Sequence, residues 1–467
     1  MKPTDRTSEG GPSPVRLFPR AFLVLLMAAL WLSLYPLLYV YLPASLRVGR
    51  SYAPFSWLIR PVPAVPTPKD TLVQAVQVPP VRSLPDTLPV EAPGDYRGFH
   101  ALAQFFQALK CSDSQIRIAY FGDSSIEGDL LSQSLRDTLQ KRFGGAGVGF
   151  VSVLPAVPHF RQTVLQEDSG NWFSYQVGIK NAKKLTPGIS GKAFATAEGW
   201  AGFKASSRYP GVGYFPSARL FYGTSPAVDS LPAIARVFRS SDTLVCPLPA
   251  QKRVNVLRVP GSALKSLRIG FSLPDDMPVY GLSFESETGV LVDNYSIRGS
   301  DGLGLLHIPS SVLEQFQQAM GYDLVVLQFG MNAITAGMKQ YGWYTQRMTD
   351  VMAHLQTAMP EADFLVVGVQ DKAAKQEDGT MATDPAIAKI TRAQRNAAYH
   401  FGAAFFSMYE AMGGEGAMLD WVENRGWGSR DFTHFNARGA EEASHLLMDF
   451  LMEGFSEHNR ASIAINR

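Results

Sequence analysis

The sequence predicts an α/β fold with a parallel sheet, extended by an inserted β-sandwich and preceded by a transmembrane helix. Apolar, partly β-branched runs alternate with helix-length segments, and strands separated by helices form βαβ units whose strands run parallel. A long middle region has the short alternating runs of antiparallel strands, and an uncharged apolar stretch lies near the N-terminus.

The first 94 residues are predicted to form a cytoplasmic tail (1–20), a transmembrane anchor (21–43) and a proline-rich stalk (44–94). No charged residue occurs from 21 to 46, and about 22 apolar residues at 1.5 Å each span roughly 33 Å as a helix, enough for a bilayer core. The run is apolar on every side, unlike a buried soluble helix, and it is too long for a cleavable signal peptide. Ten prolines between 51 and 94 favour an extended, semi-rigid spacer.

The α/β domain is predicted in two parts, residues 95–157 and 279–467. Two strand-like runs at the inner ends of these parts, 147–155 and 279–286, are assigned to this domain for their buried-strand character. Four further apolar runs with strand character cover residues 116–121, 322–330, 363–371 and 404–408. The spacing of apolar residues predicts helices over residues 96–109, 126–143, 343–357, 385–401 and 437–453.

Residues 158–278 are predicted to form the inserted β-sandwich. Short alternating runs such as SARLFYG, RVNVLRVP and SLRIGFSL are separated by Gly, Pro, Asn, Asp and Ser, a spacing typical of that architecture. A stretch of this length is too long for an ordinary loop. Six aromatic residues in loop-rich contexts either belong to the sandwich core or stack on sugars: Trp172, Tyr175, Trp200, Tyr209, Tyr214 and Tyr222.

The composition argues against a nucleic-acid partner and against a disulfide framework. Charged residues make up 18% of the chain, the formal net charge is +2, and no basic run occurs. The histidines and cysteines do not have the spacing of a zinc site. Cys111 and Cys246 either form one bridge in an oxidising compartment or stay free thiols.

A candidate nucleophile follows the first predicted strand, in the sequence Gly122-Asp123-Ser124. Functional side chains of open α/β sheets lie at the carboxyl ends of the strands. The first turn of a following helix offers free N–H groups and the positive end of a dipole, which suit a developing oxyanion. Gly, Asp and Ser are also ordinary turn formers, so a simple turn is the alternative interpretation.

A candidate base and its orienting acid lie just before the last predicted helix. A serine hydroxyl needs a base to take its proton, and imidazole is the usual base near neutral pH. His434 follows Asp431 by three residues, a spacing that in a turn lets the carboxylate contact one ring nitrogen while the other faces a partner. The alternative is that Asp431 caps the turn and His434 is a surface residue.

Two further loops contain candidate donors to an oxyanion. Asn332, in the sequence Gly330-Met331-Asn332, follows the predicted strand 322–330, and its side-chain amide can stabilise developing negative charge. Gly299 follows a short strand and can offer its backbone N–H. Each of these loops is also compatible with an ordinary turn.

Taken in this order, the motifs resemble the SGNH (GDSL-type) hydrolases. That family carries a Gly-Asp-Ser block, a glycine block, a Gly-x-Asn block and a late Asp-x-x-His block, which match residues 122–124, Gly299, Gly330 with Asn332, and Asp431 with His434. One departure is Ala333, which stands where many members have Asp. The sequence contains no G-x-S-x-G, the motif that carries the nucleophile of α/β-hydrolases, so the motifs argue against that fold.

The resemblance implies a role for each matching residue and a flavodoxin-like, three-layer α/β/α fold. Ser124 is implied as the nucleophile, His434 as the base and Asp431 as its orienting acid. The implied oxyanion hole consists of the backbone N–H groups of Ser124 and Gly299 and the side chain of Asn332. An insert between the first two blocks looks like the peptidoglycan O-acetylesterase branch and related bacterial carbohydrate esterases, in which it resembles a carbohydrate-binding module.

These features together predict a membrane-anchored extracytoplasmic serine esterase that removes O-acetyl groups from a cell-envelope glycan such as peptidoglycan. The expected location is the inner (cytoplasmic) membrane, crossed once, with the catalytic domain in the periplasm or extracytoplasmic space. The expected partners are the acetylated glycan and the membrane, and the chemistry requires no metal or organic cofactor. Two alternatives are an O-acetyltransferase that works with a multi-spanning membrane acyltransferase and an inactive glycan-binding envelope protein.

Overall fold

The computed structural model describes residues 91–465, except 112, 156, 158–160, 180, 228–231, 240–241, 336 and 377. The predicted tail, transmembrane anchor and nearly all of the predicted stalk lie outside the described residues. No helix in the described part of the chain is long and apolar enough to cross a membrane. Contacts group Leu88–Arg467 into one compact unit.

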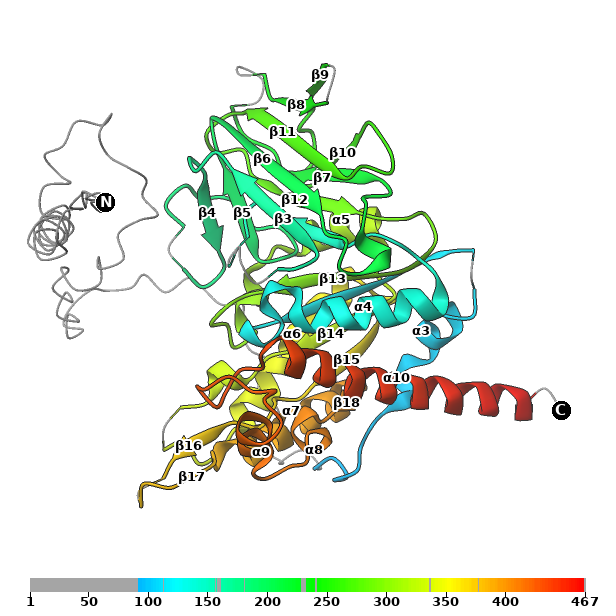
Figure 1. Cartoon of the computed structure of the whole chain (residues 1–467), viewed down its shortest axis with the longest axis vertical. Helices are drawn as coiled ribbons and strands as arrows, with labels where there is room; N and C mark the ends of the chain where they lie inside the picture. Colours follow the sequence, from blue (N-terminus) through cyan, green and yellow to red (C-terminus); the bar gives the residue numbers. More distant parts are fainter. Residues whose placement is uncertain are drawn as a thin grey trace, which may run out of the picture. The chain divides into compact units, whose positions relative to one another are not determined.

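A five-stranded parallel sheet confirms the predicted α/β class (Figure 1). Its strands, in spatial order, are β13 (Gly289–Ser296), β1 (Gln115–Gly122), β14 (Leu324–Gln328), β15 (Asp363–Val367) and β18 (Ala404–Phe406). Numbered along the chain this order is 2-1-3-4-5, the flavodoxin-like order, and it changes direction at β1. Ligands of such sheets bind at the carboxyl ends of the strands next to that switch point.

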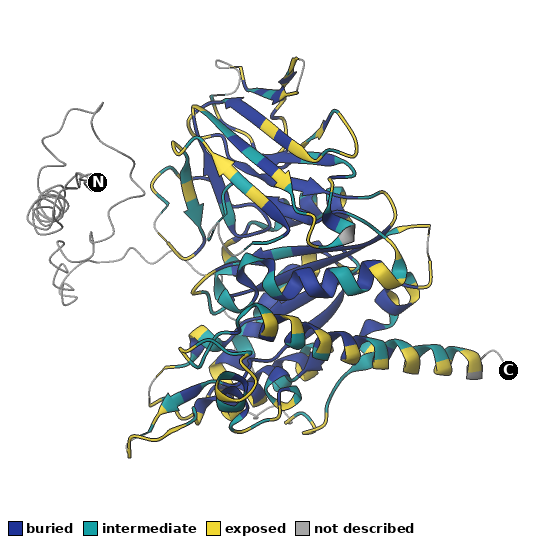
Figure 2. Ribbon diagram, in the orientation of Figure 1, coloured by how far each residue is buried: buried dark blue, intermediate teal, exposed yellow. Residues whose placement is uncertain are grey.

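Helices cover both faces of the parallel sheet and make three layers. Alternate residues of β1 point to opposite faces, so Ile118 and Tyr120 join one hydrophobic core and Ala119 and Phe121 join the other. The first core contains residues of α3 (Ala103–Ala108), α4 (Leu130–Phe143), α8 (Met408–Ala411), α9 (Ala417–Glu423) and α10 (Ala437–Ile465). The second contains residues of α5 (Ser310–Met320), α6 (Gly342–Ala358) and α7 (Ala386–Phe401). Figure 2 shows the buried strands between helices whose outer faces are exposed.

Two antiparallel sheets occupy the other end of the unit and share a third hydrophobic core. The six-stranded sheet contains β10 (Asn255–Val259), β7 (Ala218–Tyr222), β12 (Val279–Phe284), β5 (Lys192–Ala195), β4 (Phe173–Gln176) and β2 (Gly149–Ser152). The five-stranded sheet contains β3 (Val164–Asp168), β6 (Glu198–Ala205), β11 (Ser266–Ser272), β8 (Ile234–Phe238) and β9 (Thr243–Pro247). Leu220 and Leu282 from the first sheet meet Phe203 and Ile269 from the second in this core.

The antiparallel region extends beyond the predicted insert of 158–278 on both sides. The runs at 147–155 and 279–286 form β2 and β12, which pair with each other in the six-stranded sheet and not in the parallel one. Their assignment to the α/β domain is therefore wrong, because an apolar run reveals burial but not the strand with which it pairs. The outer face of this sheet also packs on α5, where the Phe221 ring stacks on Phe316 at 5.4 Å between centroids.

The helices differ from the predictions mainly at their ends. The helix expected to begin at 126 is preceded by the short 3₁₀ segment η4 (Ser124–Asp129), because Gly128 and Asp129 have positive φ values of 68° and 66°. The last helix, α10, runs to Ile465, beyond the predicted end at 453. Helices α5, α8 and α9 and the short hairpin of β16 (Ala373–Lys375) and β17 (Met381–Thr383) were not predicted from the sequence. Other 3₁₀ segments are η3 (Phe99–Leu102), η5 (Pro210–Val212), η6 (Leu303–His307) and η7 (Met331–Ala333).

Buried charges link the parallel sheet to the six-stranded sheet. The guanidinium of Arg117, on β1, is fully buried and pairs with Asp293 on β13 and with Glu285, just after β12, each at 2.7 Å. Glu285 also pairs with Arg219 on β7. Because every one of these charges has a partner, they can lie where an isolated charge would be very unfavourable.

The structure shows which of the aromatic residues of the antiparallel region are buried and whether the two cysteines form a bridge. Tyr222 is buried in the core of the antiparallel sheets, and Trp172 and Tyr209 pack against its edge. Trp200 is stacked by the Arg268 guanidinium, 3.7 Å above its ring. Tyr214 is exposed. Both cysteines are free thiols, Cys111 at the surface and Cys246 buried in the core of the antiparallel sheets.

Candidate active site

The loops that carry the predicted residues begin side by side at one edge of the parallel sheet. Gly122, at the end of β1, is in register with Ser296 of β13 and with Gln328 of β14. The three loops that follow carry Ser124, Gly299 and Asn332, respectively. Asp431 and His434 reach the same edge from the loop before α10, because the Ser124 hydroxyl contacts the His434 ring.

The turn that presents Ser124 is held tightly by its neighbours. A Cβ atom on Gly122 would lie 2.9 Å from the Gln328 carbonyl oxygen and 2.8 Å from Ile126, so only glycine fits there. The Asp123 carboxylate is buried and accepts a hydrogen bond from the Ser125 N–H at 2.8 Å. Ser124 is thus the first residue of the 3₁₀ segment η4, which precedes the regular helix α4.

Ser124, His434 and Asp431 form one chain of hydrogen bonds. Ser124 Oγ lies 2.9 Å from His434 Nε2, and His434 Nδ1 lies 2.7 Å from Asp431 Oδ2. The other carboxylate oxygen, Asp431 Oδ1, accepts the backbone N–H groups of Thr433 and His434, each at 3.0 Å. These contacts fix the carboxylate and, through it, the orientation of the imidazole. Phe432, inside this turn, has a positive φ of 53°, which lets the chain turn back within four residues.

The acid and the base of this chain are both open to solvent. The side chains of His434 and Asp431 are 40% and 51% exposed. Partial burial opposes ionisation of Asp431, but the hydrogen bonds that it accepts from His434 and Thr433 outweigh this and hold its pKa below the usual value. The carboxylate is therefore ionised at neutral pH and ready to stabilise a positive imidazolium.

The predicted oxyanion donors lie next to one another. Asn332 Nδ2 donates to Asp123 Oδ2 and to the Ser300 carbonyl, both at 3.0 Å, so the amide ties the loop after β13 to the nucleophile turn. Gly299 precedes Ser300, has a φ of 75°, and faces open space on its Cβ side. No described residue accepts a hydrogen bond from the Gly299 N–H. Burial raises the pKa of Asp123, against the hydrogen bonds from Ser125 and Asn332.

Sequence reasoning missed Gln370, which connects the nucleophile turn to the histidine turn. Gln370 is 1% exposed, and its side-chain amide donates to Ser125 Oγ at 3.0 Å and to the Thr433 carbonyl at 3.2 Å. It therefore fixes the distance between the residues that follow Ser124 and those that precede His434. The only signal in the sequence is a glutamine at the end of a buried strand, VVGVQD, which is weak by itself.

A second missed contact is an ion pair at the rim of the site. Arg298 Nη1 donates to Glu127 Oε2 at 2.7 Å, which joins η4 to the residue before Gly299. Both side chains line the pocket in front of Ser124, together with Ser125, Leu130, Gln162, Phe435 and Asn436. In the described part of the chain, no group of three or more His, Cys, Asp or Glu residues is placed to hold a metal ion.

Comparisons with known proteins agree with this geometry. A GDSL-like lipase/acylhydrolase family model matches residues 277–442, a range that contains Gly299, Asn332, Asp431 and His434. The matched region is therefore that of an SGNH (GDSL-type) hydrolase. The chain is thus an ester-hydrolysing enzyme, and Ser124 lies on the N-terminal side of the matched range.

Three solved structures match this chain to different degrees. A peptidoglycan O-acetylesterase matches with a TM-score of 0.63 and 23% identity, over 76% of this chain and 96% of its own. A putative GDSL-like lipase from Parabacteroides merdae matches with a TM-score of 0.27 and 16% identity, over 35% of this chain and 73% of its own. A carbohydrate esterase family 2 enzyme from Corynascus thermopiles (Myceliophthora fergusii) matches with a TM-score of 0.27 and 12% identity, over 61% of this chain and all of its own (100%). A comparison with curated proteins gave no match.

Proposed function

We propose that this SGNH hydrolase is a membrane-anchored extracytoplasmic esterase that removes O-acetyl groups from a cell-envelope glycan, with Ser124, His434 and Asp431 as its catalytic residues. The observation that carries the proposal is the hydrogen-bond chain from Ser124 Oγ through the His434 ring to Asp431 at the switch point of the sheet. The glycan is supported by the likeness in fold to a peptidoglycan O-acetylesterase. The apolar run of residues 21–43 supports the membrane anchor.

In the first half of the reaction, Ser124 Oγ attacks the ester carbonyl carbon while His434 Nε2 takes its proton. Asp431 stabilises the imidazolium that forms, through the 2.7 Å contact to Nδ1. The tetrahedral intermediate collapses when His434 returns this proton to the departing sugar oxygen, which leaves an acetyl group on Ser124. Water deprotonated by His434 then attacks the acetyl-serine and releases acetate.

The negative oxygen of the tetrahedral intermediate is stabilised by the N–H groups of Ser124 and Gly299 and by the Asn332 amide. Both Asn332 hydrogens already bond to Asp123 and Ser300, so the amide must redirect or share one of them as the oxyanion forms. Loss of one such donor typically lowers the rate about 10²- to 10³-fold.

Water is the acceptor that this geometry favours. His434 and Asp431 are 40% and 51% exposed, so solvent reaches the base that must activate the second nucleophile. An acetyltransferase must exclude water from that position while a sugar hydroxyl occupies it. We therefore propose hydrolysis. The two alternatives, acetyl transfer beside a multi-spanning acyl donor and glycan binding without catalysis, remain possible outcomes of the test.

We also propose that the two antiparallel sheets act as an inserted β-sandwich of the carbohydrate-binding type. Their shared core and the aromatic residues Trp200 and Tyr214 at its surface support this role. Attached to the α/β layers through Arg117 and its acidic partners, the sheets hold a glycan chain near Ser124.

The test measures acetate release from O-acetylated peptidoglycan by the full-length protein in detergent, with and without a de-acetylated oligosaccharide acceptor. We expect release that is lost in Ser124→Ala, retained in the control Ser266→Ala on the exposed face of β11, and unaffected by the acceptor. Acetyl groups that move to the acceptor would establish a transferase. If Ser124→Ala makes no difference on peptidoglycan or on aryl acetates, catalysis by this site is excluded.

A further inference from the structure

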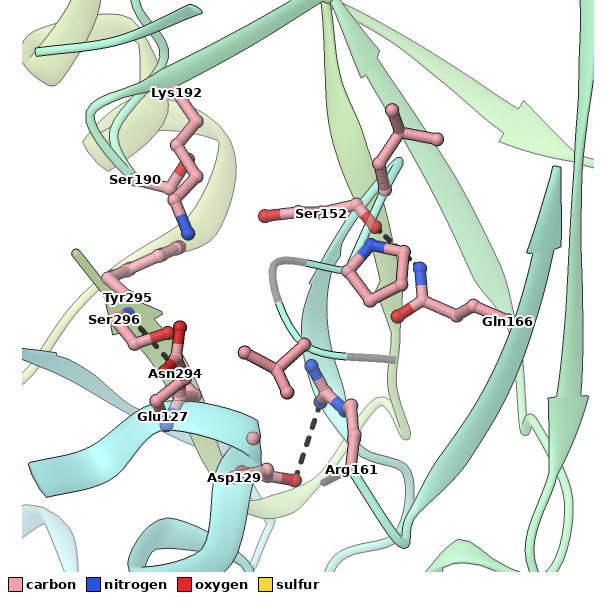
Figure 3. Close-up of a pocket in the computed structure, with 14 residues that line it drawn as sticks. Glu127, Asp129, Ser152, Arg161, Gln166, Ser190, Lys192, Asn294, Tyr295 and Ser296 are labelled. Carbon is pink, nitrogen blue, oxygen red and sulfur yellow. Dashed lines mark hydrogen bonds and ion pairs between the residues drawn. The ribbon is translucent and has the colours of Figure 1, made fainter. Parts of the chain in front are cut away.

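A small cavity lies beside the active site, between the nucleophile turn and the six-stranded sheet (Figure 3). Its volume is about 40 Å³, which is room for a functional group of a few heavy atoms. Glu127 lines both this cavity and the pocket in front of Ser124, so the two share a wall. The remaining walls come from the end of β13 and from segments of β2, β3 and β5 with their flanking loops.

Two residues that line this cavity each have a buried polar atom with no hydrogen-bond partner among the described residues. Ser190 is 2% exposed, and its Oγ is unpaired among the described residues. Glu127 is 4% exposed: one carboxylate oxygen accepts from Arg298 at 2.7 Å, while the other, Oε1, is unpaired in the part of the chain that the structure describes. A buried polar group left unpaired is unfavourable. A ligand can therefore form hydrogen bonds with both atoms without breaking an existing hydrogen bond of the protein.

Lys192, on β5, brings unpaired donors to the same cavity. Figure 3 shows its ammonium group extended from β5 into the cavity, on the side where Glu127 and Ser296 lie. No described residue forms a hydrogen bond or an ion pair with this ammonium group. Burial lowers the pKa of Lys192 to about 8, against the opposing effect of the negative charge on Glu127. The ammonium is thus still mostly protonated at neutral pH and holds free N–H donors.

The other charged groups at the cavity are already satisfied. Arg161 lies 3.4 Å from Asp129 and donates to Thr163 at 3.1 Å, and Asp129 accepts further bonds from Arg136. Among the described residues, the unpaired charged groups at the cavity are therefore Glu127 Oε1, an acceptor, and the Lys192 ammonium, a donor. The buried Ser190 hydroxyl adds a second donor.

This combination selects a neutral group that both donates and accepts. A carboxylate would be repelled by Glu127, and an ammonium would be repelled by Lys192. A secondary amide has an N–H for Glu127 and a carbonyl oxygen for Lys192 and Ser190. Leu154, Pro155 and Val157 give the cavity an apolar side, which suits a methyl group on the amide.

We propose that this cavity is a subsite for the acetamido group of an N-acetylated sugar whose ester is presented to Ser124. The inference rests on the proposed function and narrows its substrate class to glycans of N-acetylated amino sugars. In the complex, the acetamido N–H donates to Glu127 Oε1, its carbonyl accepts from Lys192 and Ser190, and its methyl contacts the apolar side.

The experiment compares two esters that differ only in this group, 6-O-acetylated N,N′-diacetylchitobiose and 6-O-acetylated cellobiose, with full-length protein in detergent. We expect kcat/KM to be at least 10-fold higher for the N-acetylated ester. Lys192→Met should remove most of this preference by raising KM for that ester alone, with p-nitrophenyl acetate hydrolysis unchanged. Ser190→Ala, which keeps the packing, should reduce the preference about 3-fold, and the exposed control Lys204→Met should leave it intact.

The outcomes separate the subsite from the proposed function. If both esters are cleaved by Ser124 at equal rates, or if Lys192→Met and Ser190→Ala keep the preference, the subsite is refuted and the esterase stands. If neither ester is cleaved, the proposed function fails, and binding of N,N′-diacetylchitobiose to Ser124→Ala decides the subsite by calorimetry. Binding that Lys192→Met weakens about 10-fold supports the subsite, and binding that is absent or unaffected overturns it.

Discussion

Two aspartates on either side of the nucleophile turn make similar sets of contacts in opposite surroundings. Asp431 accepts hydrogen bonds from His434 and Thr433, and its side chain is 51% exposed. Asp129 accepts bonds from Arg136 at 2.8 and 2.9 Å and from Ser132 and Thr163, and its side chain is fully buried.

The difference shows how burial assigns a role to a charged pair. An exposed pair contributes little to stability, typically less than about 1 kcal/mol, because water competes for both partners. Asp431 and His434 can therefore change protonation state during a reaction without endangering the fold. A buried pair is strongly destabilising when one partner is lost, because the other charge is left without water and without a counter-ion. Asp129 thus holds η4 and α4 in place.

The largest expected effect is that of Asp431→Asn on the rate. The amide cannot stabilise an imidazolium and can bind the wrong tautomer of His434, so kcat on an aryl acetate should fall about 10³- to 10⁴-fold. Urea denaturation should show a free energy of unfolding within about 1 kcal/mol of the parent, because the pair is exposed. A large loss of stability in this variant would contradict the comparison.

Asp129→Asn should have the opposite profile. Asparagine tolerates the positive φ of 66° at this position, so the variant removes the charge and keeps the backbone conformation. Arg136 and Arg161 would lose their counter-ion, and the free energy of unfolding should fall by about 3–5 kcal/mol. The rate per folded molecule, measured at low temperature, should change less than 10-fold. An unchanged urea midpoint would show that Asp129 does not stabilise the fold.

Asn332→Ala tests whether the exposed Asn332 side chain stabilises the oxyanion. The variant should lower kcat about 10²- to 10³-fold, which corresponds to about 2.7–4 kcal/mol of lost transition-state stabilisation, with little change in KM. Asn332→Asp is the matched control: it preserves size, brings a negative charge towards the oxyanion, and should be at least as inactive. A fall of less than 5-fold in Asn332→Ala would assign the stabilisation to the Ser124 and Gly299 N–H groups alone.

The smallest expected effect concerns the stability of the fold in acid. Burial opposes ionisation of Asp129, but the charges of Arg136 and Arg161 lower its pKa from 3.8 to about 2. Because the pKa is lower in the folded state, ionised Asp129 contributes about 2 kcal/mol above pH 4, and this is lost as the pH falls through about 2. Urea titrations between pH 5 and 2 should show a clearly shallower decline in Asp129→Asn than in the parent. The decline should be only slightly shallower in Asp431→Asn, because the exposed Asp431 carboxylate also has a lowered pKa. Equal slopes in all three proteins would refute the assignment.

The sequence went far in predicting the fold where patterns are local. The runs that became β1, β14, β15 and β18 were each apolar enough to be recognised as strands, and the alternation with helices indicated a parallel sheet. The prediction failed at β2 and β12, which pair with each other although more than a hundred residues separate them in the chain. The hydrophobic pattern shows that such a strand is buried and says nothing about which strand lies beside it.

The candidate site shows the same division. Ser124, Asn332, Asp431 and His434 could be named from the sequence, because each lies in a short motif at a strand end or before a helix. Gln370 could not, because its importance comes from touching Ser125 and Thr433, which are 245 and 63 residues away.

By itself, the sequence determined the residue types, the order of the motifs and the local turns that carry the chemistry of an ester-hydrolysing enzyme. The tertiary structure was needed to learn which charges are buried and which hydroxyls and carboxylates lack partners among the described residues. It was also needed to learn that Glu127 lines both the pocket at Ser124 and the cavity of Lys192. The physical reason is that burial and hydrogen-bond pairing depend on segments distant in the chain, whereas turn formation and strand character depend on neighbouring residues.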